Sequence, residues 1–399
     1  MTTDATGTVR APAEFLNDTV RAIQPSGIRR FFDMLAEMKD VISLTIGEPD
    51  FTTPEPLTRA AIAALEAGET HYSANGGMIE LRELVAANLA DRYGVRYEPR
   101  GELIITVGAS EGLDATLRAI INDGDEVIYH EPCFVAYAPL ITLGGGVPVA
   151  IATSDQADFR VTAAQIEAAV TPRTKAIFLG YPNNPTGAVL DRDELTAIGE
   201  VAERYDLLVI SDEIYDRLVY GEHRHTAISA LPGMRERTVL IGGFSKAYAM
   251  TGWRIGYVAA PAGLMEGIAK VHQYGIMCAP TAAQHAAIAA LQVGEPFVQD
   301  MLAEYDRRRQ LMTRRFNEIG LTCFEPMGAF YCFPEVTAAT GLSAEDFAQQ
   351  LLAEEHVAVV PGEAFGPSGA GHVRACYATA YEQIVEAMDR IEAFVARHR

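Results

Sequence analysis

The sequence predicts an α/β protein with a mainly parallel sheet in a large domain and a second, smaller α/β domain. Short apolar runs at 103–107, 207–211 and 238–241 are typical of buried strands. Helical patterns at 79–93 and 192–205 lie between such runs, and this alternation is typical of strand–helix–strand units. At 399 residues, the chain is long enough for two domains or for one large domain with an appendage.

The other predicted elements follow in chain order. We expect strands at 41–44, 125–129, 175–179, 255–259, 328–333, 357–362 and 372–378. We expect helices at 28–35, 56–67, 108–121, 264–274, 282–291, 296–319, 343–354 and 381–398. The run Arg307-Arg308-Arg309, in the longest of these helices, is expected to form a solvated face.

Composition argues against several classes of protein. The formal net charge of −21 argues against nucleic acid as a partner, because a phosphate backbone needs a basic surface. No run approaches the roughly 18 apolar residues of a membrane helix, and the N-terminus lacks the apolar core of a signal peptide. The five cysteines have no metal-ligand spacing, so we expect no metal, and reduced thiols in a cytoplasmic protein.

The most informative stretch surrounds Lys246, which lies in a glycine-flanked loop between two apolar runs. Burial lowers the pKa of a lysine, and a neutral amine can form a Schiff base with a carbonyl. Ser245 and Arg254 supply a hydroxyl and a guanidinium that suit a phosphate monoester. A carbonyl and a phosphate near one lysine suggest pyridoxal phosphate (PLP), although a lone lysine can also be a structural residue in a turn.

Further candidates lie at strand ends, and each also has an ordinary structural explanation. Asp212 ends a buried strand and needs a partner, which could be a protonated pyridine nitrogen, a structural ion pair or a helix terminus. Phe134 could stack on a flat ring or join the core. Asn184 lies in a loop held by two prolines, or is simply a turn former. Arg374 could clamp a carboxylate or be an edge-strand charge.

Two glycine turns could present backbone N–H groups to a ligand. Gly47 lies in a tight loop and could approach a ligand closely, or could be a plain turn residue. The turn at 108–112 links a strand to a helix, a geometry that points free N–H groups at an anion, although most such turns bind nothing. Tyr72 lies in the loop before the helix at 79–93, and without other evidence we expect its ring to pack against the protein interior.

Five motifs resemble those of the class I aminotransferases of fold type I, and they follow the family's order over almost the whole chain. They are I-G-E-P-D-F from Ile46, N-N-P-T-G from Asn183, D-E-I-Y from Asp212, S-K-A-Y-A-M-T-G-W-R-I-G from Ser245 and H-V-R-A-C-Y-A from His372. One departure is Gly243, where many members carry a phosphate-binding serine that Ser245 could replace.

The resemblance implies a role for each candidate. Lys246, Asp212 and Tyr215 are expected to be catalytic: Lys246 holds PLP as an aldimine and moves the α-proton, Asp212 pairs with the ring nitrogen, and Tyr215 contacts the phenolic oxygen. The other expected cofactor contacts are Ala109, Ser110, Phe134, Asn184, Ser245, Arg254 and, from the neighbouring subunit, Tyr72. The residues expected to bind substrate are Gly47, Asn184 and Arg374.

The resemblance also implies a ping-pong transamination of an L-amino acid, with aspartate or an aromatic amino acid favoured as donor and 2-oxoglutarate as acceptor. It implies a homodimer whose subunits each have a large domain at 46–290 and a small domain formed by 1–45 and 291–399. Ile28, Tyr72 and Tyr331 could line the substrate pocket. One alternative is a C–S β-lyase or another PLP enzyme on this fold. Another is a non-catalytic ligand-sensing protein, which would normally carry a DNA-binding domain. We expect no room for such a domain before Ile46, and the negative charge is unsuitable for DNA.

Overall fold

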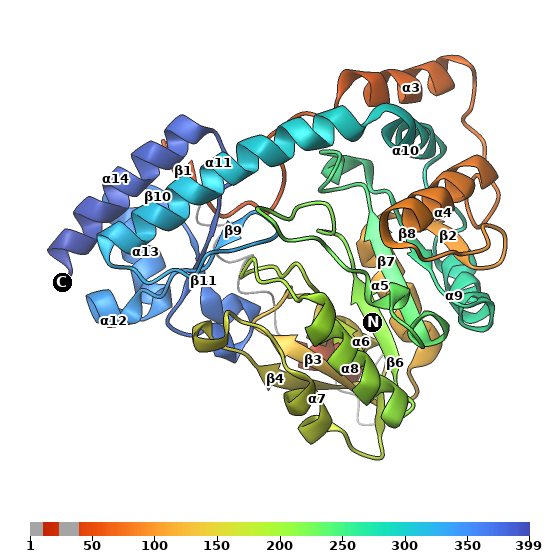
Figure 1. Cartoon of the computed structure of the whole chain (residues 1–399), viewed down its shortest axis with the longest axis horizontal. Helices are drawn as coiled ribbons and strands as arrows, with labels where there is room; N and C mark the ends of the chain where they lie inside the picture. Colours follow the sequence, from red (N-terminus) through yellow and green to blue (C-terminus); the bar gives the residue numbers. More distant parts are fainter. Residues whose placement is uncertain (1–10, 24–39) are drawn as a thin grey trace.

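A seven-stranded sheet forms the centre of the computed structural model, which describes residues 11–23 and 40–399. The strands are β2 (Leu103–Thr106), β3 (Glu126–Glu131), β4 (Val147–Ala152), β5 (Thr174–Leu179), β6 (Leu208–Asp212), β7 (Thr238–Gly243) and β8 (Gly256–Ala259). Their order across the sheet is β2-β8-β7-β6-β5-β3-β4 (Figure 1). Strand β8 runs opposite to the other six strands of this sheet, which all point in one direction; this confirms the predicted mainly parallel α/β arrangement.

Helices cover both faces of this sheet, which explains why its strands are continuous apolar runs. Val209 and Ile210, neighbours in β6, pack into different apolar clusters on opposite faces. One face is covered by α5 (Gly108–Ile120), α6 (Tyr137–Leu143) and α9 (Ala262–Gly275). The other face is covered by α4 (Ile79–Tyr93), α7 (Ala163–Ala169), α8 (Arg192–Arg204) and α10 (Thr281–Val293), with α3 (Glu55–Glu66) packed on α10.

The sheet brings three predicted site segments to one edge. The helix α5 starts two residues after β2 ends, β6 ends at Asp212, and β7 leads into the loop that carries Lys246. These three strands point in the same direction, so their carboxyl ends meet at the same edge of the sheet. Segments far apart in the sequence therefore converge there.

A second group of elements shares one apolar cluster beyond this sheet. It contains the helices α11 (Glu295–Ile319), α12 (Thr337–Thr340), α13 (Ala344–Glu355) and α14 (Tyr381–Arg397), and the strands β1 (Ile42–Ser43), β9 (Tyr331–Cys332), β10 (Val357–Ala358) and β12 (Val373–Cys376). The neighbouring strand β11 (Val360–Pro361) contributes Val360 to a cluster of the large sheet instead. Strand β1 pairs in parallel with β10, and β11, β12 and β9 form an antiparallel sheet. Helix α11 extends from α10 to this group (Figure 1).

Some predicted elements differ from the structure. The strand expected at 328–333 is reduced to β9, because Ala329 has a left-handed φ of 55° that interrupts extended pairing. The elements α6, β4 and α7 have no counterpart among the predicted ones. Strand β4 is an edge strand that contains Pro148 and is largely accessible to solvent, so its apolar signal is weak. The helix expected at 28–35 lies outside the described residues.

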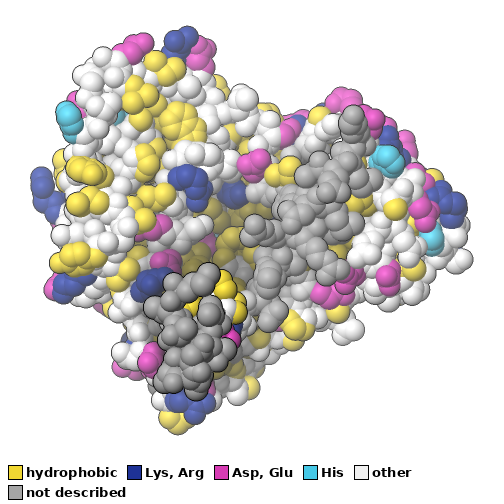
Figure 2. All heavy atoms as spheres, turned by 180° about the vertical axis from the view of Figure 1, so that it is seen from behind, with side chains coloured by type: hydrophobic (Ala, Val, Ile, Leu, Met, Phe, Trp, Pro, Cys, Tyr) yellow, Lys and Arg dark blue, Asp and Glu magenta, His cyan; other side chains and the backbone are white. Residues whose placement is uncertain are grey.

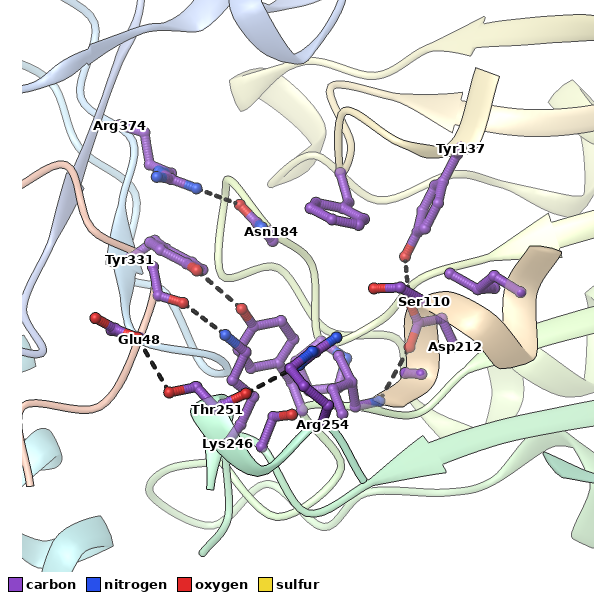
Figure 3. A pocket seen from close by; sticks show the side chains of 18 of the residues that line it. Glu48, Ser110, Tyr137, Asn184, Asp212, Lys246, Thr251, Arg254, Tyr331 and Arg374 are labelled. Atoms are coloured by element: carbon purple, nitrogen blue, oxygen red, sulfur yellow. Dashed lines mark hydrogen bonds between the residues drawn. The ribbon is translucent and has the colours of Figure 1, made fainter. Parts of the chain in front are cut away.

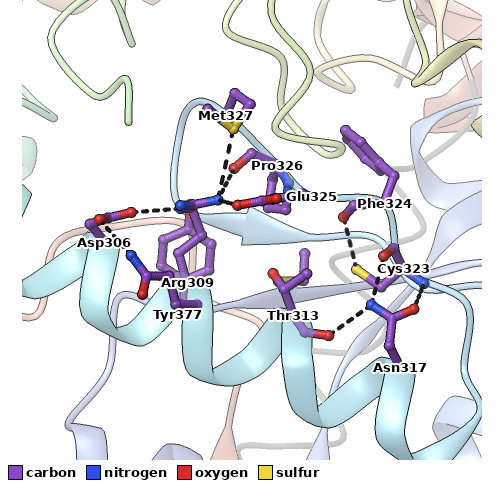
Figure 4. A network of polar contacts seen from close by, with 12 residues as sticks. Asp306, Arg309, Thr313, Asn317, Cys323, Phe324, Glu325, Pro326, Met327 and Tyr377 are labelled. Atoms are coloured by element: carbon purple, nitrogen blue, oxygen red, sulfur yellow. Dashed lines mark hydrogen bonds and ion pairs between the residues drawn. The ribbon is translucent and has the colours of Figure 1, made fainter. Parts of the chain in front are cut away.

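The prediction of a solvated arginine face on α11 is wrong for two of its three residues. Arg307 is exposed, but Arg308 and Arg309 are buried. Nη1 of Arg308 donates to both carboxylate oxygens of Asp50 at 2.9 Å. Nη1 of Arg309 donates to Oε1 of Glu325 at 2.7 Å (Figure 4). Carboxylates from distant segments therefore pair with these charges and allow their burial.

Acidic and basic side chains are interspersed with hydrophobic ones on the face opposite to that of Figure 1, which is hollowed near its centre (Figure 2). Within residues 11–23 and 40–399, no helix is both long enough and apolar enough to cross a membrane. All five cysteines are free thiols, and four of them are buried.

Candidate active site

All of the predicted site residues except Tyr72 line one cavity of about 320 Å³ at the carboxyl edge of the large sheet (Figure 3). The predicted site residues in its wall are Gly47, Ala109, Ser110, Phe134, Asn184, Asp212, Tyr215, Ser245, Lys246, Arg254 and Arg374. Tyr331, predicted as a pocket residue, is also there. The remaining lining residues are Thr45, Glu48, Leu113, Tyr137, Pro182, Ile214 and Thr251.

Lys246 reaches into this cavity from the loop that follows β7 (Figure 3). Its Nζ donates a hydrogen bond of 2.5 Å to the carbonyl oxygen of Gly47. Nζ lies 5.7 Å from the ring centroid of Tyr215 and 5.5 Å from that of Phe330. Burial lowers the pKa of the Lys246 amine to about 8, and the positive charge of Arg374 acts in the same direction. An amine with this pKa is substantially neutral near pH 8 and can act as a nucleophile or a base.

One part of the cavity wall combines a helix N-terminus with a guanidinium group. Among residues 11–23 and 40–399, no side chain caps the start of α5, so backbone N–H groups of its first turn remain available. Nη1 of Arg254 donates to the carbonyl oxygen of Thr251 at 3.0 Å, and a Cβ atom on Gly108 would lie 2.6 Å from Nη2 of Arg254. Glycine at 108 therefore lets the guanidinium lie against the start of α5. Together with the hydroxyl of Ser245, these donors suit a phosphate group.

The carboxylate of Asp212 is buried at the end of β6. Its Oδ2 accepts a hydrogen bond of 2.8 Å from the hydroxyl of Tyr137, and its Oδ1 accepts one of 3.2 Å from the N–H of Ile214. Burial raises the pKa of Asp212 to about 6, although both hydrogen bonds oppose the shift. In the part of the chain that the structure describes, no cation forms an ion pair with this carboxylate. A cationic group bound in the cavity would offset the cost of its burial.

Arg374 in β12 is only 4% exposed, and its guanidinium makes two hydrogen bonds and contacts two aromatic rings. Its Nη1 donates to Oδ1 of Asn184 at 2.9 Å, and its Nη2 donates to the carbonyl oxygen of Thr45 at 2.6 Å (Figure 3). Its guanidinium carbon lies 4.5 Å from the ring centroid of Tyr331 and 4.7 Å from that of Phe365. Because Oδ1 of Asn184 accepts from Arg374, the amide NH₂ of Asn184 remains free to donate into the cavity.

Two sequence-derived candidates lie outside this wall. The side chain of Tyr72 is 82% exposed and does not line the cavity of its own chain. Gly243 does not line the cavity, and a Cβ atom there would lie 2.9 Å from Cδ1 of Ile214, which does line it. The hydroxyl expected at this position in the family is therefore absent, and Ser245 is the serine of this loop that lines the cavity. Ile28 lies outside the described residues.

Sequence reasoning missed Tyr137, Glu48, Thr45 and Thr251 as lining residues. Tyr137 begins α6, three residues after Phe134, which lies in the preceding loop. The hydroxyl of Thr251 donates to Oε2 of Glu48 at 3.0 Å, which ties the loop that carries Gly47 to the loop that carries Lys246. No signal in the sequence joins these two segments.

The donor set of the cavity fits PLP. A lysine of lowered pKa suits the carbonyl, the start of α5 with the guanidinium of Arg254 suits the phosphate, and the unpaired buried carboxylate of Asp212 suits a protonated ring nitrogen. These groups line one continuous cavity.

Comparison with known proteins agrees with this chemistry. Residues 39–391 match the model of the family described as aminotransferase class I and II. The aspartate aminotransferase of Pyrococcus abyssi is 45% identical over 94% of this chain and 97% of its own length. The aromatic-amino-acid aminotransferase 2 of Thermococcus litoralis is 44% identical over 94% of this chain and 97% of its own length.

A solved structure extends the comparison to three dimensions. The crystal structure of an aromatic aminotransferase from Pyrococcus horikoshii superposes with a TM-score of 0.88 at 44% identity, covering 92% of this chain and 99% of that one. The chain therefore belongs to the aminotransferase class I and II family, and it is a PLP-dependent aminotransferase of fold type I.

Proposed function

We propose that this aminotransferase moves the amino group of L-aspartate or an aromatic L-amino acid to 2-oxoglutarate in a ping-pong reaction. The observation that carries the proposal is that one cavity holds a lysine of lowered pKa and a buried arginine with hydrogen-bonding capacity to spare, Lys246 and Arg374. The names of the relatives from Pyrococcus abyssi and Thermococcus litoralis support the two donor classes.

The cofactor contacts that we propose follow from the chemistry of the wall. The backbone of Ala109 and Ser110 at the start of α5 and the side chains of Ser245 and Arg254 would hold the phosphate. Phe134 would contact the ring, and Asp212 would pair with its protonated nitrogen. Asn184 and Tyr215 would donate hydrogen bonds to the phenolic oxygen, and Lys246 would hold the carbonyl carbon. This assignment places each donor opposite a group of complementary charge.

The substrate contacts and proton transfers complete the proposed mechanism. The bound cofactor supplies an electron sink for the bonding pair released at Cα and carries the amino group between the two substrates. Arg374 and the backbone of Gly47 bind the α-carboxylate and so orient the Cα–H bond. Nζ of Lys246, displaced by the substrate amine, removes the Cα proton and returns a proton in the second half-reaction. Its pKa of about 8 keeps much of the amine in the basic form near that pH.

We further propose a homodimer in which Tyr72 reaches the phosphate site of the neighbouring subunit. Its 82% exposure supports this role, and Tyr274 is another large aromatic residue that is 87% exposed. Large exposed aromatic side chains are typical of interfaces. Sedimentation velocity tests the dimer, and a Tyr72→Phe variant with unchanged PLP affinity would contradict the shared site.

The domain division remains a proposal as well. We propose a large domain at 46–290 and a small domain formed by 1–45 and 291–399, which closes on the substrate. The apolar cluster shared by α11, α13 and α14 supports the second unit. The five free thiols support a reducing, cytoplasmic location.

The decisive experiment is a titration of the purified holoenzyme with a panel of L-amino acids, followed by absorbance and by detection of products. We expect the band of the bound cofactor to change with aspartate or an aromatic amino acid, with one oxo acid formed per site. Addition of 2-oxoglutarate should restore the band. A Lys246→Ala variant should do neither.

The alternatives give different results in the same experiment. Ammonia and pyruvate released from a cysteine-type substrate, without restoration by an oxo acid, would indicate a β-lyase. A protein that binds amino acids without forming any product would indicate a ligand-sensing role. Either result would refute the proposed transamination.

A further inference from the structure

Tyr331 is a fully buried residue of the cavity wall that contacts two proposed functional groups at once. Its hydroxyl oxygen lies 2.8 Å from that of Tyr215, and its ring lies against the guanidinium of Arg374, 4.5 Å from ring centroid to guanidinium carbon. Figure 3 shows the side chain of Tyr331 below that of Arg374. The residue comes from β9, whereas Tyr215 follows β6 and Arg374 lies in β12. Three separate segments therefore meet at this ring.

Either hydroxyl group could donate in the hydrogen bond between Tyr331 and Tyr215. Each phenol carries one proton, and burial raises the pKa of both far enough to keep them protonated. Within the described residues, the hydroxyl of Tyr331 has no hydrogen-bond partner besides Tyr215. Its other neighbour is the backbone at Gly47, which approaches so closely that a Cβ atom there would collide with the hydroxyl oxygen. When Tyr215 donates to the cofactor's phenolic oxygen, as proposed above, the bond between the two hydroxyl groups needs Tyr331 as its donor, because each phenol has only one proton.

The ring of Tyr331 has a second effect. The guanidinium carbon of Arg374 lies over this ring and also over that of Phe365, 4.7 Å from its centroid. Hydrogen bonds to Asn184 and Thr45 hold two of the guanidinium nitrogens. The two rings restrict the movement of the guanidinium, and they contribute cation–π attraction in a desolvated setting.

We propose that Tyr331 is a positioning residue for transamination: its hydroxyl directs the proton of Tyr215 towards the cofactor's phenolic oxygen, and its ring orients Arg374 for the substrate carboxylate. This inference rests on the proposed function. It assigns two separable effects to two parts of one side chain. The Tyr331→Phe variant removes only the hydroxyl, whereas the Tyr331→Leu variant removes the hydroxyl and the aromatic face.

The first readout is the pH titration of the bound cofactor's absorbance in the holoenzyme. A hydrogen bond donated to the phenolic oxygen stabilises the deprotonated, more negative form of the bound cofactor. We expect Tyr331→Phe to raise the titration midpoint by roughly half a pH unit, because losing one neutral donor weakens the bond that Tyr215 donates. Tyr215→Phe should raise the midpoint in the same direction and by more.

The second readout is KM for the fastest amino acid donor. We expect Tyr331→Phe to leave KM within about twofold of the wild-type value, because the aromatic face remains. We expect Tyr331→Leu to raise KM on the order of tenfold, in line with the loss of a buried cation–π contact. A general defect in folding would lower the amount of active enzyme without separating the two variants in this way.

Tyr305→Phe is the matched control. Tyr305 is also a fully buried tyrosine, its hydroxyl has no hydrogen-bond partner in the described part of the chain, and it does not line the cavity. This variant should change neither readout. The inference is overturned if Tyr331→Phe titrates like wild type while Tyr215→Phe shifts, or if Tyr331→Leu keeps the wild-type KM. Absence of transamination by the wild-type enzyme would instead refute the proposed function.

Discussion

Replacement of Arg374 by leucine tests the proposed carboxylate site most directly. The guanidinium is 4% exposed, and its Nε has no hydrogen-bond partner within the described residues. Its Nη1 and Nη2 already donate to Asn184 and to the carbonyl oxygen of Thr45. A planar group with five N–H donors retains capacity for a carboxylate after these two bonds are made. Leucine has similar bulk but offers no donor.

The magnitude follows from the number of bonds that are lost. A hydrogen bond to a charged group is worth about 1.5–3 kcal/mol, so two of them amount to roughly 3–6 kcal/mol. At about 1.4 kcal/mol per factor of ten, we expect kcat/KM for an amino acid to fall roughly 10²–10⁴-fold. We also expect a lower melting temperature, because the oxygens of Asn184 and Thr45 lose a buried donor.

The assay compares an amino acid with the amine that lacks its α-carboxylate. Arg374→Leu should lower kcat/KM for the amino acid and leave the weak reaction of the amine nearly unchanged. Arg374→Lys keeps the positive charge but not the planar fork, so its loss for the amino acid should be intermediate. Equal losses for both substrates would show that Arg374 acts on something other than the carboxylate, and would refute the reasoning.

Two further predictions concern the cofactor loop and the response of stability to pH. We expect Gly243→Ser to destabilise the protein by about 1 kcal/mol through contact with Ile214, without tighter PLP binding. We expect Ser245→Ala to weaken PLP binding about tenfold. Denaturant unfolding measures the first effect, and PLP titration of both variants measures the second. Burial lowers the pKa of His225, but the charge and hydrogen bond of Glu213 raise it more, so the net pKa lies above the ordinary 6.5. The stabilisation from this pair is therefore complete below pH 6.5 and is lost as pH rises through the folded-state pKa. The difference in melting temperature between wild type and His225→Gln should be largest below pH 6.5 and should narrow above it; a constant difference would contradict the linkage.

The parts of the fold and site that could be predicted are those encoded within short contiguous stretches. The segment around Lys246 combines a strand, a glycine loop and a second strand, and each of them leaves a local signal. Helix α4 was predicted with the bounds that the structure has, Ile79–Tyr93, because its ends coincide with loop residues and Gly94.

The parts that could not be predicted depend on partners distant in sequence. A run of arginines is usually solvated, and nothing near Arg308 reveals that Asp50 pairs with it. Tyr331 could be named as a pocket residue, but its bond to Tyr215 joins positions 116 residues apart. The edge strand β4 has half-exposed alternate positions and an internal proline, so its periodicity is too weak to separate it from a loop.

The bond between Arg308 and Asp50 has a mechanical consequence. Helix α11 spans 25 residues, and at 1.5 Å per residue it is about 37 Å long. Arg308 lies close to its midpoint, and Asp50 belongs to the loop that carries Gly47. If α11 tilts as a rigid lever, its ends move in opposite directions while a point at the middle stays nearly still. The loop is attached to the helix at this middle point. The end of α11 that packs against α13 and α14 can therefore move while Gly47 stays beside Lys246.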